Sequence, residues 1–265
     1  MSNSPEQTSA IRTQLIHRLL NAAVTITCLG YVYQFNTYSN KTFSLLWGVM
    51  GYSEQFAEVA TGTMIVLLLL SAGCIWIRQT RYLALSAVAV YLVEVMSQSF
   101  LPAAQFPFVY PFEWALRYVT PVAAVLLYSK SERCHKSAYM IMKVAISVTF
   151  AAHGVKALAG YATFIDYLLV FFNKIGFENL TEKSALMVLH MIGTIDIFLA
   201  QHLLFFKKSR TKYVIMWMAV WGLITALSRV VYGGFESYHE VLIRSTHFLT
   251  PLAYALMLNI KRPKK

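Results

Sequence analysis

Charged residues are scarce in this chain: they make up 13% of its 265 residues, whereas hydrophobic residues make up 57%. Soluble domains carry about 25% charged residues, so this composition excludes an ordinary soluble globular protein. Long apolar segments recur instead, for example over residues 60–77 and 214–227. The sequence therefore predicts a polytopic membrane protein in contact with a lipid bilayer, and its length allows about eight spans with short loops.

Cysteine is also rare, and Cys28, Cys74 and Cys134 form no CxxC pair and no His/Cys metal-ligand spacing. We therefore expect no metal site. The chain also lacks a glycine-rich nucleotide loop, a GxSxG nucleophile elbow and an HExxH motif. No small-residue cleavage site follows a short apolar core near the N-terminus, so we expect the first span to remain as an anchor.

The apolar segments predict an all-α membrane protein with eight transmembrane helices. We place the spans at 15–36, 56–77, 82–100, 109–128, 138–158, 184–206, 212–232 and 239–259. The expected organisation is an N-terminal cytoplasmic segment (1–14), two four-helix repeats (15–128 and 138–259), a cytoplasmic linker (129–137) and a basic cytoplasmic tail (260–265).

The distribution of basic residues predicts the orientation. Fifteen of the Lys and Arg residues that flank the predicted spans fall on one side of the membrane, and only Lys41, Lys174 and Lys183 fall on the other. By the positive-inside rule, the richer side and both termini are cytoplasmic in a cell inner (plasma) membrane. The net charge of +11 then reflects this orientation and does not indicate a nucleic-acid partner.

The two halves of the chain resemble each other. RYLALSAVAVYLVEVMSQSFLPA (81–103) aligns with KYVIMWMAVWGLITALSRVVYGG (212–234), and RYVTPVAAVLL (117–127) aligns with HFLTPLAYALM (247–257). Each repeat has an even number of spans, so the repeats are expected to be parallel and related by an axis along the membrane normal. Chance similarity between apolar helices is the alternative explanation.

Each predicted repeat has a further apolar segment after its first span. These segments are TFSLLWGVMGY (42–52) and TFIDYLLVFFNKIGF (163–177). The apolar spacing and the aromatic residues of the second segment favour a short helix that lies in the membrane interface. A non-helical loop packed at the interface is the alternative.

The second repeat carries a family resemblance. Its segments AAHGVKALAGYATF (151–164) and HMIGTIDIFLA (190–200), with a glycine followed by an acidic residue, resemble the DoxX/DoxD-like integral membrane family. The resemblance implies two tandem four-helix units that act as membrane subunits of quinone-linked oxidoreductases, or as scaffolds and chaperones of other membrane proteins. The first repeat departs from this pattern, because Ile65 stands opposite Asp196 and Leu29 stands opposite His153.

Ionisable residues inside the predicted spans fall mainly in the outer half of the membrane. A charged group at mid-bilayer costs about 2.5–3.5 kcal/mol on insertion scales, so these side chains are expected to face the bundle interior, pair with each other or meet water. We predict that Arg244 pairs with Asp196, and that Glu94 pairs with an arginine. Glu113 is close enough to a span end to be an ordinary solvated residue. The candidate ligand-binding residues are Glu94, Arg117, His153, Lys156, Asp196, Arg229, Arg244 and His247.

Two prolines lie next to this layer. Pro121 and Pro251 have no N–H, so the carbonyl groups of Arg117 and His247 lose their helical donors and need another partner. Arg244 and His247 are three residues apart, which places them on one face of a continuous helix over 239–259.

The excess of cations in the layer favours an anionic or carbonyl-rich ligand, since arginine donates hydrogen bonds in a planar fork. We therefore predict a pocket for a quinone or a small anion, in a subunit of a membrane oxidoreductase complex with a membrane or periplasmic protein partner. The alternatives are a small-anion transporter, a non-enzymatic scaffold or assembly factor, and an ion-pair network that only holds the helices together. No catalytic residue is assigned.

Overall fold

The computed structural model describes residues 5–38, 41–97, 106–177, 180–206 and 208–258, and every regular element in these ranges is helical. The predicted tail over 260–265 lies outside them. The elements are α1 (Pro5–Thr37), α2 (Lys41–Ser44), the π-helix η1 (Leu45–Val49), α3 (Glu54–Cys74), α4 (Arg81–Ser97), α5 (Tyr110–Glu113), α6 (Ala115–Tyr128), α7 (Glu132–Leu158), α8 (Ala162–Lys174), α9 (Glu182–Phe205), α10 (Lys208–Gly233), the 3-10 helix η3 (Phe235–Ser237), α11 (Tyr238–Ile243) and α12 (Thr246–Leu258).

Within the described ranges, five helices are long and apolar enough to cross a membrane: α1, α3, α7, α9 and α10. The pair α11 and α12 forms a sixth candidate span that is bent by 41°, and α4 and α6 contain shorter apolar helices. The outer faces of these helices are apolar, as shown by the exposed Leu67 on α3, Met191 on α9 and Val220 on α10. A continuous apolar outer surface suits contact with lipid, so the structure supports a multi-pass membrane protein.

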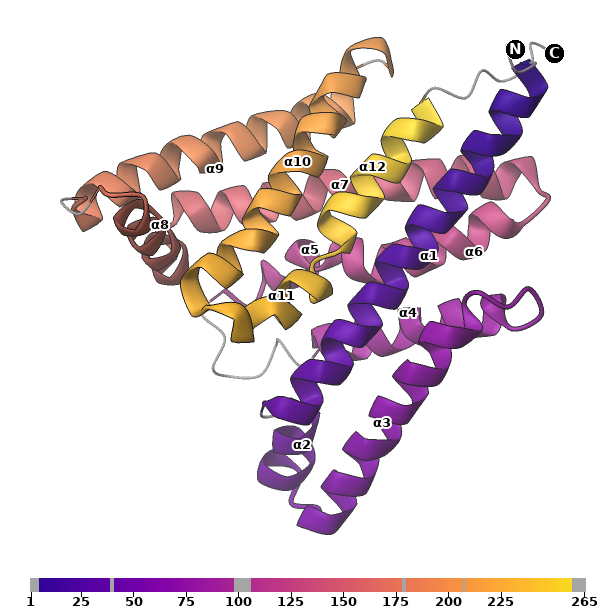
Figure 1. The fold of residues 1–265 in the computed structure, drawn as a ribbon, viewed down its shortest axis with the longest axis horizontal. Coiled ribbons are helices and arrows are strands. Elements are labelled where there is room, and N and C mark those ends of the chain that lie inside the picture. The colour runs from indigo at the N-terminus through magenta and orange to yellow at the C-terminus, as the bar shows by residue number, and fades with distance from the viewer. Residues whose placement is uncertain (1–4, 39–40, 98–105, 178–179, 207, 259–265) are drawn as a thin grey trace.

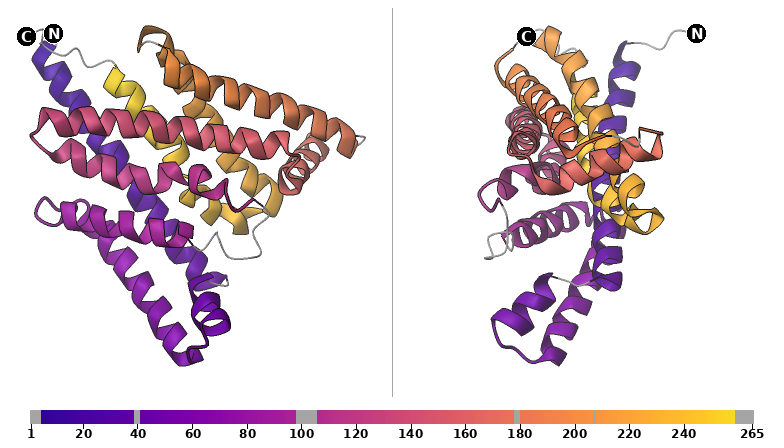
Figure 2. Two further views of the ribbon diagram at one scale, coloured as in Figure 1. Left: turned by 180° about the vertical axis from the view of Figure 1, so that it is seen from behind. Right: turned by 90° about the vertical axis from the view of Figure 1, so that its left-hand side faces the viewer.

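The contacts between the long helices define the arrangement of the bundle. α1 packs against α3 and α12, α4 packs against α6, α7 packs against α6 and α9, and α10 packs against α12 (Figure 1). Seen from behind, α7 and α6 run side by side, while α3 with α2 and α9 with α8 lie at opposite ends of the molecule (Figure 2).

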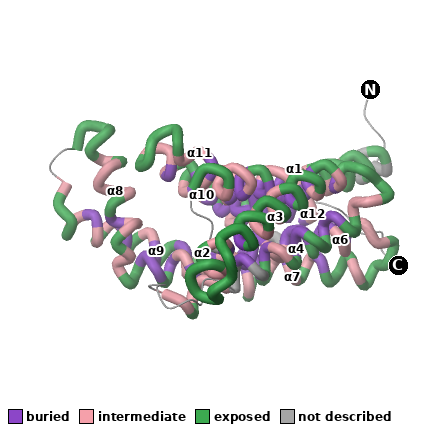
Figure 3. The backbone as a smooth tube through the Cα atoms, turned by 90° about the horizontal axis from the view of Figure 1, so that it is seen from below, coloured by how far each residue is buried: buried purple, intermediate pink, exposed green. Residues whose placement is uncertain are grey.

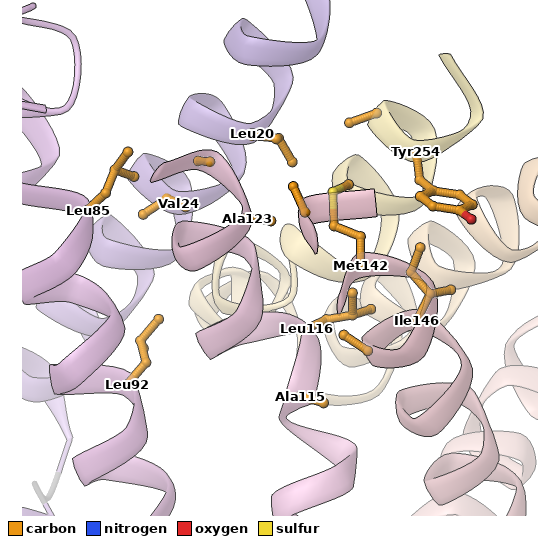
Figure 4. Packing of buried hydrophobic residues seen from close by; sticks show 14 of the residues in the cluster. Leu20, Val24, Leu85, Leu92, Ala115, Leu116, Ala123, Met142, Ile146 and Tyr254 are labelled. Carbon is orange, nitrogen blue, oxygen red and sulfur yellow. The ribbon is translucent and has the colours of Figure 1, made fainter. Parts of the chain in front are cut away.

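The main hydrophobic core lies where the central helices meet. Leu20 of α1, Leu85 of α4, Leu116 of α6, Met142 of α7 and Tyr254 of α12 are all fully buried in it (Figure 4). Burial falls off outwards, and most of α3 is exposed (Figure 3). The core therefore joins helices from both halves of the chain into one unit.

Two predicted spans are not single helices. The segment 109–128 is divided at Trp114 into α5 and α6, and 239–259 is divided at Arg244 and Ser245 into α11 and α12. The second break is held by α1, because Ser245 Oγ donates to the Ala23 carbonyl at 2.7 Å and lies 2.9 Å from Thr27 Oγ1. Thr27 Oγ1 also donates to the Ile243 carbonyl at 3.5 Å, and the His247 N–H, which would bond that carbonyl in a continuous helix, donates to the Arg244 carbonyl instead. The prediction of a continuous helix over 239–259 was wrong.

The segment predicted to form an interfacial helix in the second half is α8, which contacts both α9 and α10. Lys174 at its end donates a hydrogen bond to the carbonyl of Val231 on α10. The corresponding segment of the first half forms only α2 and η1. In addition, α7 begins at Glu132, so it includes much of the predicted linker over 129–137.

Close packing of α7 against α9 depends on two glycines. A Cβ atom on Gly154 would lie 2.8 Å from the Gly193 carbonyl oxygen, and a Cβ on Gly193 would lie 2.7 Å from the Gly154 carbonyl oxygen. Small residues allow helix backbones in a membrane to approach closely and gain van der Waals contact. The two helices therefore behave as a tightly joined pair.

We expect Gly193→Ala to destabilise the protein by about 1–3 kcal/mol, because the added methyl group forces α7 and α9 apart. Gly62→Ala on α3 is the control, since a Cβ there meets nothing within 4 Å. Thermal unfolding in detergent should show a lower midpoint for Gly193→Ala and an unchanged or higher midpoint for Gly62→Ala. Equal midpoints for the two variants would contradict the close contact.

Candidate functional site

Glu113 is the centre of a buried ion-pair cluster. Its Oε2 accepts a hydrogen bond from Lys156 Nζ at 2.9 Å, and its Oε1 lies 3.5 Å from His153 Nε2. Glu113 is 5% exposed and Lys156 is 2% exposed. Breaking such a buried pair leaves one charge without compensation, so each member requires the other.

The end of α7 positions Lys156. Gly160 has φ +65° and follows the last residues of the helix. The Gly160 N–H donates to the Ala157 carbonyl and the Tyr161 N–H donates to the Lys156 carbonyl, both at 3.1 Å, which is a Schellman motif. This turn brings the Tyr161 ring to 4.1 Å from Lys156 Nζ. Aromatic faces attract cations, and rings of Tyr110 and Phe164 also approach Lys156.

Arg117 lies in the first turn of α6 and is 4% exposed. Its Nη1 donates to the Tyr31 hydroxyl of α1 at 2.9 Å, and its guanidinium carbon lies 4.2 Å from the centre of the Trp114 ring. Its Nε has no hydrogen-bond partner. Among the described side chains, no carboxylate lies within 4.0 Å of Arg117, so this buried cation is held by neutral groups.

Glu240 of α11 forms the second carboxylate site. Its Oε2 accepts a hydrogen bond from Arg244 Nη1 at 3.0 Å and lies 3.8 Å from Arg229 Nε. Arg229 also donates to the Thr225 carbonyl and the Ser228 hydroxyl, and stacks 4.3 Å from the centre of the Tyr167 ring. One carboxylate therefore serves two arginines.

These groups line a common cavity of about 270 Å³, which we call the chamber. Four cationic side chains and two carboxylates contribute to its wall, together with aromatic rings from α1, α5 and α8. The cations are Arg117, Lys156, Arg229 and Arg244, and the carboxylates are Glu113 and Glu240. The charge of the described lining is therefore positive overall.

A second cavity of about 450 Å³, the groove, lies between α8, α9 and α10 and is lined mainly by apolar side chains. Phe164, Tyr167 and Arg229 line both the chamber and the groove, so the two cavities adjoin. His153 and Asp196 also line the groove. Asp196 is 4% exposed, and its Oδ1 has no hydrogen-bond partner.

His247 lies beside the cluster and does not line either cavity. Its ring centre is 5.6 Å from that of His153, and its Nε2 has no partner. Pro251 leaves the His247 carbonyl without a helical donor, as predicted from the sequence. That carbonyl faces Gly222 of α10 so closely that a Cβ there would be 2.3 Å from the oxygen. The freed carbonyl thus meets a Cα–H group on a neighbouring helix.

Seven of the eight predicted site residues can be placed. Arg117, Lys156, Arg229 and Arg244 line the chamber, while His153 and Asp196 line the groove. The predicted pairing of Arg244 with Asp196 was wrong, because Arg244 pairs with Glu240, one helical turn before it. The side chain of Glu94 lies outside the described residues, so its pairing with an arginine is untested.

Sequence reasoning missed both carboxylates of the chamber. Glu113 was considered a solvated flank residue, and Glu240 was not singled out. A signal was present for Glu240, which precedes Arg244 by four residues, a spacing that brings opposite charges together on a helix. Glu113 precedes Arg117 by the same spacing, but it pairs with Lys156 instead. The chamber aromatics carried no comparable signal, since aromatic residues are common throughout the chain.

No protein family model, curated protein or solved structure matches this chain.

We expect Glu113→Gln to destabilise the protein by about 3–5 kcal/mol, because it leaves Lys156 charged, buried and without a carboxylate. Glu240→Gln should cost less, since its side chain is 35% exposed. Thermal unfolding in detergent measures both effects.

The double variant Glu113→Gln/Lys156→Met provides the control. It removes both charges, so it should recover most of the stability that the single Glu113 variant loses. Additive losses in the double variant would show that Lys156 does not depend on Glu113.

Proposed function

We propose that this chain is a membrane protein that binds an anionic head group in the chamber. The observation that carries this proposal is the excess of cations in the described lining, where Arg117 is buried and no described carboxylate lies within 4.0 Å of it. A bound anion would offset charges that are costly to bury alone. In addition, α6 and α12 begin beside the chamber, and the N-terminus of a helix carries a partial positive charge.

The same proposal includes eight spans in two parallel four-helix repeats. In this scheme α1, α3, α4 and α6 correspond to α7, α9, α10 and α12. The packing supports it, because α1 with α3 corresponds to α7 with α9, α4 with α6 corresponds to α10 with α12, and α1 with α12 corresponds to α7 with α6. Thr120 and Thr250, which precede the shared prolines, lie 2.8 Å apart through their hydroxyl groups, as a two-fold axis between them requires.

We further propose that both termini are cytoplasmic and that the chamber opens towards the non-cytoplasmic side of the inner membrane. The positive-inside distribution supports this orientation. The resemblance to the DoxX-like family remains a prediction, and it favours a subunit of a membrane oxidoreductase complex.

A quinone is the second candidate ligand. It is favoured by the aromatic rings of Tyr110, Trp114, Tyr161 and Phe164, which line the chamber and offer faces on which a flat ring can stack. The arginines would donate hydrogen bonds to its carbonyl oxygens. An anion would also neutralise the excess positive charge of the chamber, which a neutral quinone would not. For this reason an anion is the leading proposal.

The orientation can be tested with an impermeant maleimide on intact cells. Cys134, partly exposed and predicted to be cytoplasmic, should be labelled only after the cells are permeabilised. A cysteine introduced by Phe235→Cys, at a residue that is 80% exposed, should be labelled without permeabilisation. A Cys74→Ser background removes the other partly exposed thiol. The reverse labelling pattern would place the chamber on the cytoplasmic side.

The ligand proposal predicts that purified protein binds inorganic phosphate, and that Arg117→Gln weakens this binding about tenfold or more. The reason is that a hydrogen bond to a charged group contributes about 1.5–3 kcal/mol. Titration calorimetry in detergent measures the affinity. Arg81→Gln is the matched control, because Arg81 also stacks on a ring, that of Tyr128, but lies outside the chamber.

Arg117→Lys keeps the positive charge and serves as a second test if the Gln variant misfolds. It should bind phosphate with an affinity between those of the native protein and the Gln variant. Binding of a short-chain benzoquinone, with no binding of phosphate, would replace the anion with the quinone. Absence of binding of either probe would refute the proposed function.

A further inference from the structure

We propose that the ligand is an amphiphile drawn from the bilayer, with its anionic head group in the chamber and a hydrocarbon chain in the groove. This inference rests on the proposed function and names its substrate class as a long-chain anionic lipid. It is carried by the shared wall of the two cavities, which is formed by Phe164, Tyr167 and Arg229.

The two cavities have opposite chemical character. The chamber presents four cationic side chains, whereas the groove presents leucine, isoleucine, valine and phenylalanine side chains from three helices. Together their volumes are within the range of about 300–1,000 Å³ that small-molecule sites occupy. A purely polar ligand would leave the groove without an apolar occupant, and a neutral hydrocarbon would leave the excess positive charge of the chamber uncompensated. A molecule with both parts satisfies both cavities.

The boundary between the two cavities is suited to binding the anionic head group. The guanidinium of Arg229 lies there, 4.3 Å from the centre of the Tyr167 ring, with its side chain 6% exposed. Its Nε approaches Glu240 only to 3.8 Å and has no hydrogen-bond partner. An anionic oxygen at this boundary would therefore find an arginine donor that the protein itself leaves incompletely used.

The groove also fixes the direction in which such a molecule binds. Asp196 lines the groove, and among its described lining residues this is the one carboxyl group. The cations of the chamber attract the anionic head group and the groove offers no described cation other than Arg229 at the boundary, so the head group lies in the chamber and the hydrocarbon chain extends into the groove.

The position of the groove points to the bilayer as the source of the ligand. The groove lies between α9 and α10, which diverge towards the end bridged by α8 (Figure 1). Ile224 and Leu227, which line the groove from α10, are 48% and 47% exposed. These side chains belong to the apolar outer surface, so a hydrocarbon chain could enter sideways without crossing water.

The test uses 12-doxyl-stearate, a long-chain carboxylate whose nitroxide quenches tryptophan fluorescence at short range. A variant with Trp47, Trp76 and Trp217 changed to Phe keeps Trp114 in the chamber and Trp221 in the groove, and a further Trp221→Phe change identifies the Trp221 signal. We expect saturable quenching of Trp221 by 12-doxyl-stearate, and about tenfold weaker quenching by its uncharged methyl ester. Inorganic phosphate should compete with the stearate.

Matched variants of α9 separate the groove from the outer surface. Val188→Phe adds volume inside the groove and should weaken stearate binding about tenfold, whereas Met187→Phe adds the same ring at a position that is 63% exposed and should leave it unchanged. Leu168→Phe on α8 repeats the groove-filling test if the Val188 variant does not fold.

Phosphate binding distinguishes this inference from the proposed function. Retention of phosphate binding in Val188→Phe, with loss of stearate quenching, supports both. Equal quenching by the stearate and its methyl ester, or quenching unaffected by both groove-filling variants while phosphate still binds, overturns the amphiphile and leaves the anion site intact. Absence of phosphate and stearate binding in the otherwise native protein overturns both.

Discussion

The structure depends on one constraint: a cation removed from water needs a counter-charge or another polar partner nearby. Lys156 meets it through Glu113, and Arg244 meets it through Glu240. The pair of Glu113 on α5 and Lys156 on α7 joins the two halves of the chain, whereas the pair of Glu240 and Arg244 lies within α11 and its C-terminal end. Among the described residues, Arg117 meets the constraint through a tyrosine hydroxyl and an indole ring, and this incomplete compensation is the basis of the proposed anion site.

Irregular backbone in the protein gathers at the same place. The α5–α6 break at Trp114 and the α11–α12 break at Arg244 both border the chamber. Non-helical backbone at membrane depth is tolerated only where protein or a cavity satisfies it. Thr27 provides such satisfaction at the second break, because its hydroxyl group donates to the Ile243 carbonyl.

The sequence was sufficient for the helical class and for most cationic residues of the site, because burying charge in an apolar segment leaves a clear pattern. The partners were harder to predict. Glu113 and Glu240 lie near helix ends, where acidic residues are usually solvated, but the fold buries Glu113 against Lys156 and places Glu240 beside Arg229 and Arg244. Pairing Arg244 with Asp196 overlooked Glu240, which lies one helical turn before Arg244. The groove arises from the divergence of α9 and α10, which no local sequence pattern encodes.

The glycine contact between α7 and α9 has a mechanical consequence. The backbones of α7 and α9 are in contact at Gly154 and Gly193, so α9 is held in place against the centre of the molecule. The opposite side of the groove consists of α10 and of the short α8, which is tied to α10 through Lys174. Any widening of the groove therefore requires α8 and α10 to move together, as one unit, away from α9.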